Sequence, residues 1–162
     1  HYYFYTGVPK IMVTAEIAKD LVRDPEGMYV CLPFRAEGGE WVLDKAGAFF
    51  KPGEQLPDGC CDYYSVNRGM VLEGDRTGIA VNTLDSPMIM INGLKLWDYT
   101  KTADTSGPVY SWLSNNKWET NFRTQCAGYL ESRYIIEIGT EAKDNGRQVL
   151  ESNEWDILTI RA

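Results

Sequence analysis

The segment Val109–Arg123, V-Y-S-W-L-S-N-N-K-W-E-T-N-F-R, carries the strongest local pattern in the chain. Its middle, Ser114–Lys117, has turn chemistry, because asparagine tolerates left-handed backbone angles and bonds its own backbone. The flanks, Tyr110–Leu113 and Trp118–Phe122, have aromatic residues and threonine at a density typical of strands. The segment therefore predicts a hairpin or a tight corner with an amide-rich tip.

Two interpretations of this tip stay open. Aromatic faces beside planar amides and a guanidinium suit a sugar, whose C–H face stacks on tryptophan while its hydroxyls bond the polar groups. The alternative is a core hairpin whose tryptophans pack inward and whose asparagines bond local backbone. Composition alone favours the core hairpin, since aromatic residues in strands are usually buried. The candidate sugar contacts are Trp112, Asn115, Asn116, Trp118, Asn121 and Arg123.

Length and composition indicate a single β-rich domain. A chain of 162 residues can bury a substantial core. Ten Tyr, five Trp and fifteen Gly suggest many short strands joined by turns. The net charge of −7 argues against a nucleic-acid or anionic-membrane partner, because no basic patch is available to offset phosphate charge.

Neither a membrane span nor a signal peptide is predicted, so we expect a soluble chain of unassigned location. No run approaches the roughly 18 apolar residues that a spanning helix needs, and the N-terminus lacks a basic segment followed by an apolar one. The chain begins His1-Tyr2-Tyr3-Phe4-Tyr5, without Met. This start suggests processing, or an excised piece of a longer protein.

Hydrophobic alternation predicts strands along most of the chain. Tyr134, Ile136 and Ile138 alternate with Arg133, Ile135 and Glu137, while Met88–Ile91 is apolar throughout, as in a strand buried on both faces. Further strands are expected near Ile11–Val13 (where a helical face also fits), at Met28–Phe34 with Pro33 at an edge or end, and at Trp41–Leu43, Ser65–Leu72, Ile79–Thr83 and Trp155–Ile160. Asn92-Gly93 and Lys143–Arg147 are expected to be turns, and Leu94–Gly107 an irregular loop.

The string N-N-K-W-E-T-N-F-R resembles the NN-x-W-x-T-N-F signature in the C-terminal β-domain of glycoside hydrolase family 38, the α-mannosidases and their bacterial relatives. Other segments agree in order from about Ala15 to Ile138. They are Asp24–Phe34, then Gln55-Leu56-Pro57 with Asp62-Tyr63-Tyr64, then Asp85 and Pro87, then Gln125 and Gly128. Cys60-Cys61 departs from the pattern, since small polar residues are usual there.

The resemblance implies an all-β antiparallel β-sandwich, resembling part of a galactose-mutarotase-like supersandwich. Residues 1–162 would form one sandwich domain, a fragment of a larger multidomain protein. In that family the zinc, nucleophile and acid lie in a separate N-terminal α/β domain, and no segment here matches it. We therefore expect no cofactor in this chain, and zinc only in the absent catalytic domain. That domain would be the partner within the same polypeptide, and the β-domain can contribute rim residues to the sugar site.

Chemistry within the chain has little support from the sequence. His1 is the only histidine, which argues against a Ser-His-Asp triad and a Cys/His zinc site. Cys31, Cys60, Cys61 and Cys126 match no paired motif, and free thiols are favoured. Carboxylates are plentiful but none is paired by motif as glycoside hydrolysis requires. Asp85 is expected to form a backbone-bonding corner; Asp62 either has a structural role or lines a groove, with Tyr64 and Arg68 as further candidate sugar contacts.

Three functions follow as hypotheses. The first is an accessory β-sandwich of an α-mannosidase-like glycoside hydrolase, not catalytic alone. The second is a stand-alone carbohydrate-binding module, which needs Trp112 and Trp118 to be exposed. The third is a purely structural or assembly domain, which could form a homodimer through an open sheet edge.

Overall fold

Two antiparallel sheets and a pair of short helices make up the molecule. We describe a computed structural model, for residues 1–96, 98–117 and 127–154. In chain order, the larger sheet contains β1 (Tyr2–Phe4), β2 (Lys10–Lys19), β4 (Glu40–Lys45), β5 (Ala48–Phe50), β7 (Gly69–Glu73), β8 (Gly78–Thr83) and β11 (Gly128–Gly139). The smaller sheet contains β3 (Gly27–Leu32), β6 (Tyr64–Ser65), β9 (Met88–Ile91) and β10 (Val109–Asn115). The helices are α1 (Thr140–Asp144) and α2 (Gly146–Ser152).

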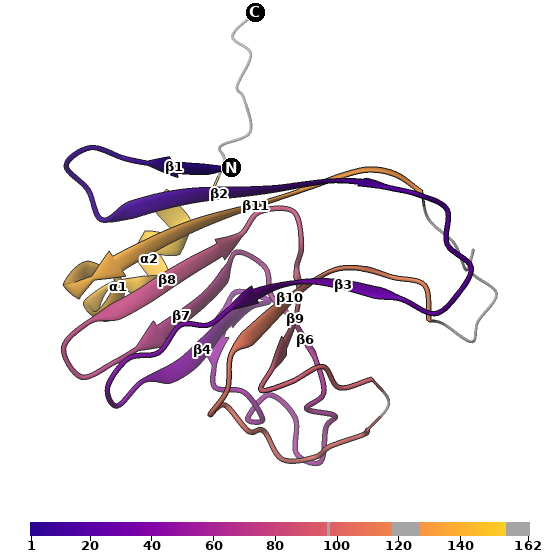
Figure 1. The fold of residues 1–162 in the computed structure, drawn as a ribbon. Coiled ribbons are helices and arrows are strands. Elements are labelled where there is room, and N and C mark those ends of the chain that lie inside the picture. The colour runs from indigo at the N-terminus through magenta and orange to yellow at the C-terminus, as the bar shows by residue number, and fades with distance from the viewer. Residues whose placement is uncertain (97, 118–126, 155–162) are drawn as a thin grey trace, which may run out of the picture.

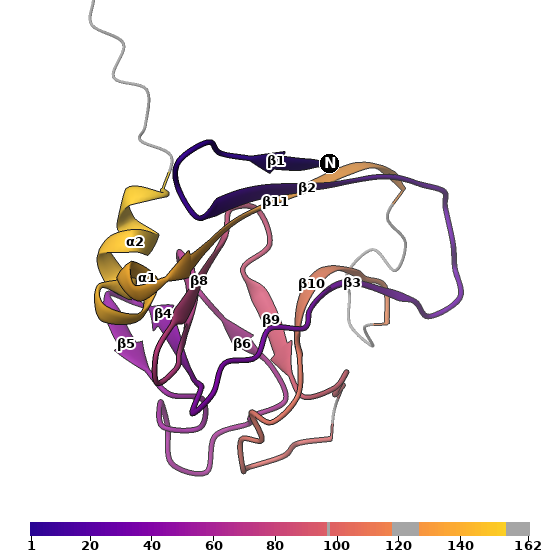
Figure 2. The ribbon, with the colours of Figure 1, turned by 60° about the vertical axis from the view of Figure 1, so that its left-hand side comes forward.

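The seven strands of the larger sheet have the spatial order β1-β2-β11-β8-β7-β4-β5, and the four of the smaller sheet the order β3-β10-β9-β6. The smaller sheet covers one face of the larger sheet, and the helices cover the other (Figure 1, Figure 2). The predicted all-β sandwich is confirmed. Its open edges are β1 and β5 in the larger sheet and β3 and β6 in the smaller one, while the homodimer expected from such an edge stays a prediction.

The main core lies between the two sheets, as the strand alternation requires. The larger sheet contributes Leu43, Met70, Val81, Tyr134 and Ile136, and the smaller sheet contributes Leu32, Ile89, Ile91 and Val109. Within this core the Tyr134 hydroxyl donates a hydrogen bond to the Ser111 hydroxyl at 2.8 Å, from the larger sheet to the smaller. Burial raises the pKa of Tyr134, so this hydroxyl stays protonated and can donate.

The predicted strand signals agree with most of the structure. Met88–Ile91 forms β9 in the middle of the smaller sheet, and Pro33 directly follows β3, an edge strand. Asn92 and Gly93 both have positive φ, 55° and 116°, as a tight turn requires. The loop between β9 and β10 is irregular where it is described.

Two predictions about secondary structure were wrong. Lys143–Arg147 is not a simple turn, because it spans the end of α1 and the start of α2. These helices form because Ala142, Val149 and Leu150 pack on the outer face of β7 and β8, a tertiary contact that short local patterns do not reveal.

Ser65–Leu72 is likewise not one strand. Residues 66–68 cross from β6 in the smaller sheet to β7 in the larger sheet. Their backbone amides bond outside the strand ladders: the Val66 N–H donates to the Pro87 carbonyl, and the Asn67 N–H donates to the Asp44 carbonyl. The expected final strand, Trp155–Ile160, lies outside the described residues.

Gly69 lies where β7 passes closest to β8. Its φ is +152°, and a Cβ added there would lie 1.9 Å from the Val81 carbonyl oxygen. Gly93 also has positive φ, +116°, but a Cβ there meets no atom within 4 Å. Gly69 is therefore required both by its backbone conformation and by lack of space, whereas Gly93 is required by its backbone conformation alone.

We expect Gly69→Ala to lower the free energy of unfolding by about 3 kcal/mol or more, because backbone strain and overpacking add at this position. Gly93→Ala is the control and should cost only about 1 kcal/mol, from strain alone. Urea denaturation of both variants measures the difference. Equal losses would contradict the close approach of β7 and β8.

Candidate functional site

The Trp112 side chain is mostly buried against neighbouring aromatic rings. Its side chain on β10 is 8% exposed. Its ring stacks on Tyr29 with centroids 6.0 Å apart, and Tyr63 meets it edge-on at 5.9 Å. The indole Nε1 donates to the Ser114 carbonyl at 3.2 Å. Trp112 therefore does not present an exposed face to a sugar.

Asn116 joins the end of β10 to the segment that precedes β3. Its Oδ1 accepts from the Glu26 N–H at 2.5 Å, and its Nδ2 donates to the carbonyls of Val22 and Asp24 at 3.1 and 2.9 Å. The residue is 9% exposed. Nearby, Asn115 Oδ1 accepts from the Lys117 N–H at 2.8 Å, the local amide bond expected of the tip. Asn116 thus uses both ends of its amide in structural bonds, whereas Asn115 uses only its oxygen and its buried Nδ2 has no partner among the described residues.

Asp62 organises the loop before β10. Its carboxylate accepts from the N–H groups of Tyr99 and Thr100 and from the Thr100 hydroxyl, at 2.8, 3.0 and 2.5 Å. Burial alone favours the protonated acid, but these hydrogen bonds outweigh it and hold the pKa of Asp62 below its ordinary value. Its role is structural, the first of the two alternatives that the sequence left open.

The other candidates lie elsewhere. Tyr64 is buried at 2% exposure. Arg68 bonds Asp44 at 3.2 Å and Glu154 at 2.9 Å. Trp118, Asn121 and Arg123 lie outside the described residues. Of the described candidates, Trp112 and Asn115 line one groove of about 400 Å³ together with Met88, Leu113 and Ser114, and the others do not line it.

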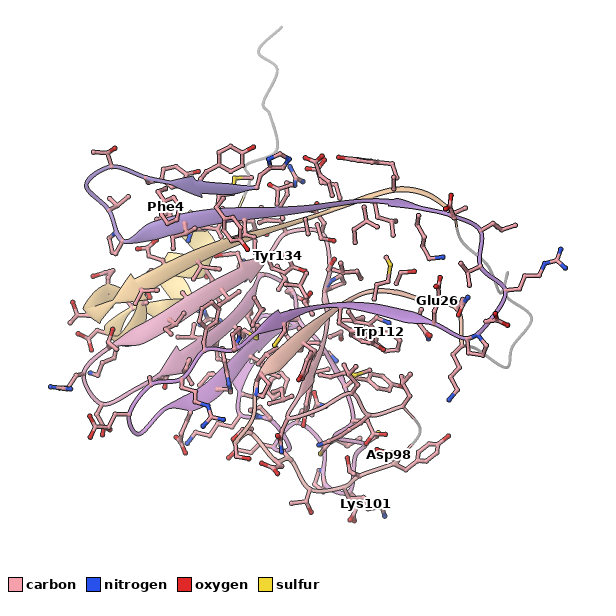
Figure 3. All side chains as sticks on the ribbon, viewed as in Figure 1. Phe4, Glu26, Asp98, Lys101, Trp112 and Tyr134 are labelled. Atoms are coloured by element: carbon pink, nitrogen blue, oxygen red, sulfur yellow. The ribbon has the colours of Figure 1, made fainter. Side chains whose placement is uncertain are left out.

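A groove of about 470 Å³ lies on the larger sheet, on the face that carries the helices. Strand alternation fixes this face, because Val13 and Tyr134 point into the core and their neighbours therefore point away from it. The groove is lined by Tyr3, Phe4, Tyr5, Met12, Thr14, Glu16, Glu131 and Arg133. In Figure 3, Phe4 on β1 lies well away from Trp112 and Glu26, so the groove is distinct from the predicted tip.

The register of β2 and β11 places the polar groups of the groove. Glu16 lies directly opposite Glu131, and Thr14 lies directly opposite Arg133. Arg133 Nε lies 3.5 Å from the Glu131 carboxylate. Desolvation and the carboxylates of Glu16 and Glu131 raise the pKa of Tyr129, an exposed neighbour. The groove thus combines two facing carboxylates with one guanidinium.

Asp85 fixes the orientation of Arg133. Its Oδ2 accepts from Arg133 N–H and Nε at 2.8 and 2.9 Å, and its Oδ1 accepts from a terminal guanidinium nitrogen at 2.8 Å. These bonds, chiefly those from the guanidinium, hold the pKa of Asp85 below its ordinary value. Asp85 does bond backbone, but the amide is that of Arg133 on β11 and not the local one of the predicted Asx-type corner. The ion pair adds an orienting role that the sequence did not reveal.

Aromatic side chains form the wall of the groove nearest the sheet edge. Tyr3 and Tyr5 are 52% and 46% exposed. The aromatic run Tyr2–Tyr5 is visible in the sequence, but its pattern alone does not predict a groove wall. The acidic pair could not be found by motif, because Glu16 and Glu131 meet only through the strand register.

No metal-binding cluster supplements these sites: in the ranges that the structure covers, no three His, Cys, Asp or Glu side chains are placed to hold an ion. Cys31, Cys60 and Cys61 are free thiols, as predicted, and Cys126 lies outside the described residues. Among described helices, none has the length and apolar character needed to cross a membrane.

Comparison with known proteins adds no relative. No family model, no curated protein and no solved structure matches the chain.

We expect Asn116→Ala to lower the free energy of unfolding by about 2 kcal/mol, because three partly buried backbone groups lose their partner. Asn67→Ala, at an exposed position, is the matched control and should change it by less than about 0.5 kcal/mol. Urea denaturation provides the measurement. A loss no larger than that of the control would show that Asn116 does not hold the two segments together.

Acid should selectively remove the stabilisation that Asp85 provides. Its pKa in the folded protein is lowered, so the stabilisation is present above the ordinary carboxyl pKa of about 4 and is lost as pH falls through the lower folded value. Asp85→Asn should therefore melt below the parent protein at pH 7, and the gap should close towards pH 2.5. Asp98→Asn, at an exposed loop position, should show no such pH-dependent gap. A gap for Asp85→Asn that persists at pH 2.5 would contradict the ion pair with Arg133.

Proposed function

We propose that this chain is an accessory β-sandwich domain of an α-mannosidase-like glycoside hydrolase, which packs on a separate catalytic domain. In this proposal the chain does not hydrolyse glycosides alone. Its contribution is to support the catalytic domain and to supply part of the rim of the glycan site. Zinc belongs to the catalytic domain, and this chain holds no cofactor.

One observation carries the proposal: four of the segments with the family resemblance form or adjoin the strands of one sheet, although Gln55–Pro57 lies in a loop and Gly128 begins β11 of the larger sheet. Asp24–Phe34 contains β3, Tyr64 begins β6, Asp85 and Pro87 precede β9, and the asparagine-rich motif begins at the end of β10. These four strands are the whole of the smaller sheet as described. Segments scattered over some ninety positions thus converge on one structural unit, as expected if the resemblance reflects a common domain.

The end of the smaller sheet where β3 begins and β10 ends is the surface we assign to the catalytic domain. Asn116 closes this end by bonding the Val22–Glu26 segment. The buried Lys19 side chain pairs with the Glu26 carboxylate and reinforces the same junction. A rigid junction of this kind suits a domain that positions rim residues for a neighbouring active site.

The complete polypeptide offers the decisive test. We expect an upstream α/β domain with metal-ligating His and Asp residues, and zinc-dependent release of 4-nitrophenol from 4-nitrophenyl α-mannoside. The present chain alone should release none. Within the full polypeptide, Asn116→Ala should lower the activity several-fold by loosening the junction, whereas Asn67→Ala should leave it unchanged.

An open reading frame without such an upstream domain would contradict the proposal. So would full mannosidase activity in a polypeptide from which the β-domain has been removed.

A further inference from the structure

We propose that the groove formed by β1, β2 and β11 binds a neutral carbohydrate. This inference goes beyond the accessory role proposed above and does not depend on it, because it concerns another surface and other residues. Its basis is the combination of shape, aromatic lining, a hydroxyl without a partner among the described residues, and mixed charge in one place.

The shape and the aromatic wall suit a sugar ring. The volume of about 470 Å³ lies within the range of small-molecule sites, about 300–1,000 Å³. Tyr3 and Tyr5 remain half-exposed, although His1 stacks on Tyr3 with the ring centroids 6.4 Å apart, so part of each ring surface is open to a ligand. Each tyrosine combines an apolar ring with a hydroxyl, and a sugar likewise combines an apolar C–H face with polar edges.

Thr14 supplies an unused hydrogen-bonding group. It lines the groove and is only 7% exposed. Its backbone amide bonds the His1 carbonyl, but its hydroxyl has no hydrogen-bond partner among the residues that the structure describes. The hydroxyl oxygen is not fully buried, so a ligand in the groove can reach it. A hydroxyl can both donate and accept, and a ligand hydroxyl would match both roles.

The polar groups suit a neutral ligand with both donors and acceptors. Glu16 and Glu131 face each other across the β2–β11 pair and would repel an anion. The charge of Arg133 is balanced by Asp85 and Glu131, but a cation offers no acceptor to a guanidinium. A polyol satisfies both sides, because each hydroxyl can donate to a carboxylate and accept from a guanidinium.

The rest of the binding arrangement is already rigid. Ten consecutive residue pairs join β2 to β11 beneath the groove. The three bonds from Asp85 fix Arg133 before any ligand arrives. Little conformational freedom is therefore lost on binding at this floor, which favours measurable affinity for a small ligand.

The test is a titration of the ¹⁵N-labelled chain with neutral trisaccharides, namely mannotriose, cellotriose and maltotriose, followed by ¹H–¹⁵N correlation spectra. We expect at least one of them, at millimolar concentration, to shift amide signals of β1, β2 and β11 on the groove. Tyr3→Ala should weaken that binding about five-fold, and Thr14→Val should weaken it to a similar degree.

Tyr2→Ala is the matched control. Tyr2 is adjacent on β1 and 71% exposed, but it does not line the groove, so affinity should stay within two-fold. Thermal melting of each variant identifies losses caused by unfolding, and Glu131→Gln provides a second groove variant should Thr14→Val fail to fold.

Three outcomes of the titration with the neutral sugars and the Tyr2→Ala control would overturn the proposal. They are no signal shift with any of the three sugars at 20 mM, shifts that map away from β1, β2 and β11, and equal weakening by Tyr2→Ala. Stronger binding of choline or of 3′-sialyllactose would also overturn it, because it would show selection for charge. Binding is measured on this chain alone, so failure here is separate from failure of the proposed role beside a catalytic domain.

Discussion

The pairing of β2 with β11 is the constraint on which the rest of the structure depends. It joins ten consecutive residues of Lys10–Lys19 to Gly128–Glu137. Residues more than a hundred positions apart thereby become neighbours, at a considerable cost in chain entropy. One face of this ladder brings Val13 and Tyr134 to the core, and the other forms the floor of the groove. A slip of one residue would exchange the two faces, so core and groove are specified together.

The junction at the end of β10 and the edge of the larger sheet at β1 differ in their side chains. At one end Asn116, Lys19 and Glu26 close the junction between β10, β2 and β3 with buried polar contacts. Such contacts contribute strongly to specificity, because each broken bond leaves a buried group without a partner. At the sheet edge, β1 leaves its aromatic side chains open to solvent. The junction at the end of β10, where the family resemblance is strongest, is therefore closed by polar contacts. The β1 edge, which the resemblance does not cover, exposes aromatic side chains.

Sequence reasoning predicted the fold class because its signals are local. Alternation at Tyr134, Ile136 and Ile138 and the apolar run Met88–Ile91 identify strands without knowledge of their partners. The helices after β11 were missed because Ala142 and Leu150 are stabilised by contact with Val71 and Ala80, which no nearby residue reveals. Tertiary packing, not propensity, decides such short helices.

The candidate site was harder to predict for the same reason. The predicted turn at Ser114–Lys117 was wrong in its first half, because Ser114 and Asn115 belong to β10, and the second flank of the predicted hairpin lies outside the described residues. Whether Trp112 faces solvent depends on Tyr29 on β3 and Tyr63 just before β6. Glu16 and Arg133 could not be predicted to line one groove, because they are brought together only by the register of β2 and β11. The pairing of Asp85 with Arg133 likewise depends on contact between distant parts of the chain.

The hydroxyl pair of Tyr134 and Ser111 has a consequence for how the layers fit. Apolar side chains would tolerate small sliding of one sheet over the other, since dispersion forces have little directionality. A directional bond across the interior does not, because a displaced layer would bury two unmatched hydroxyls. This contact therefore helps to align the two layers, and its donor lies on the same strand as Arg133.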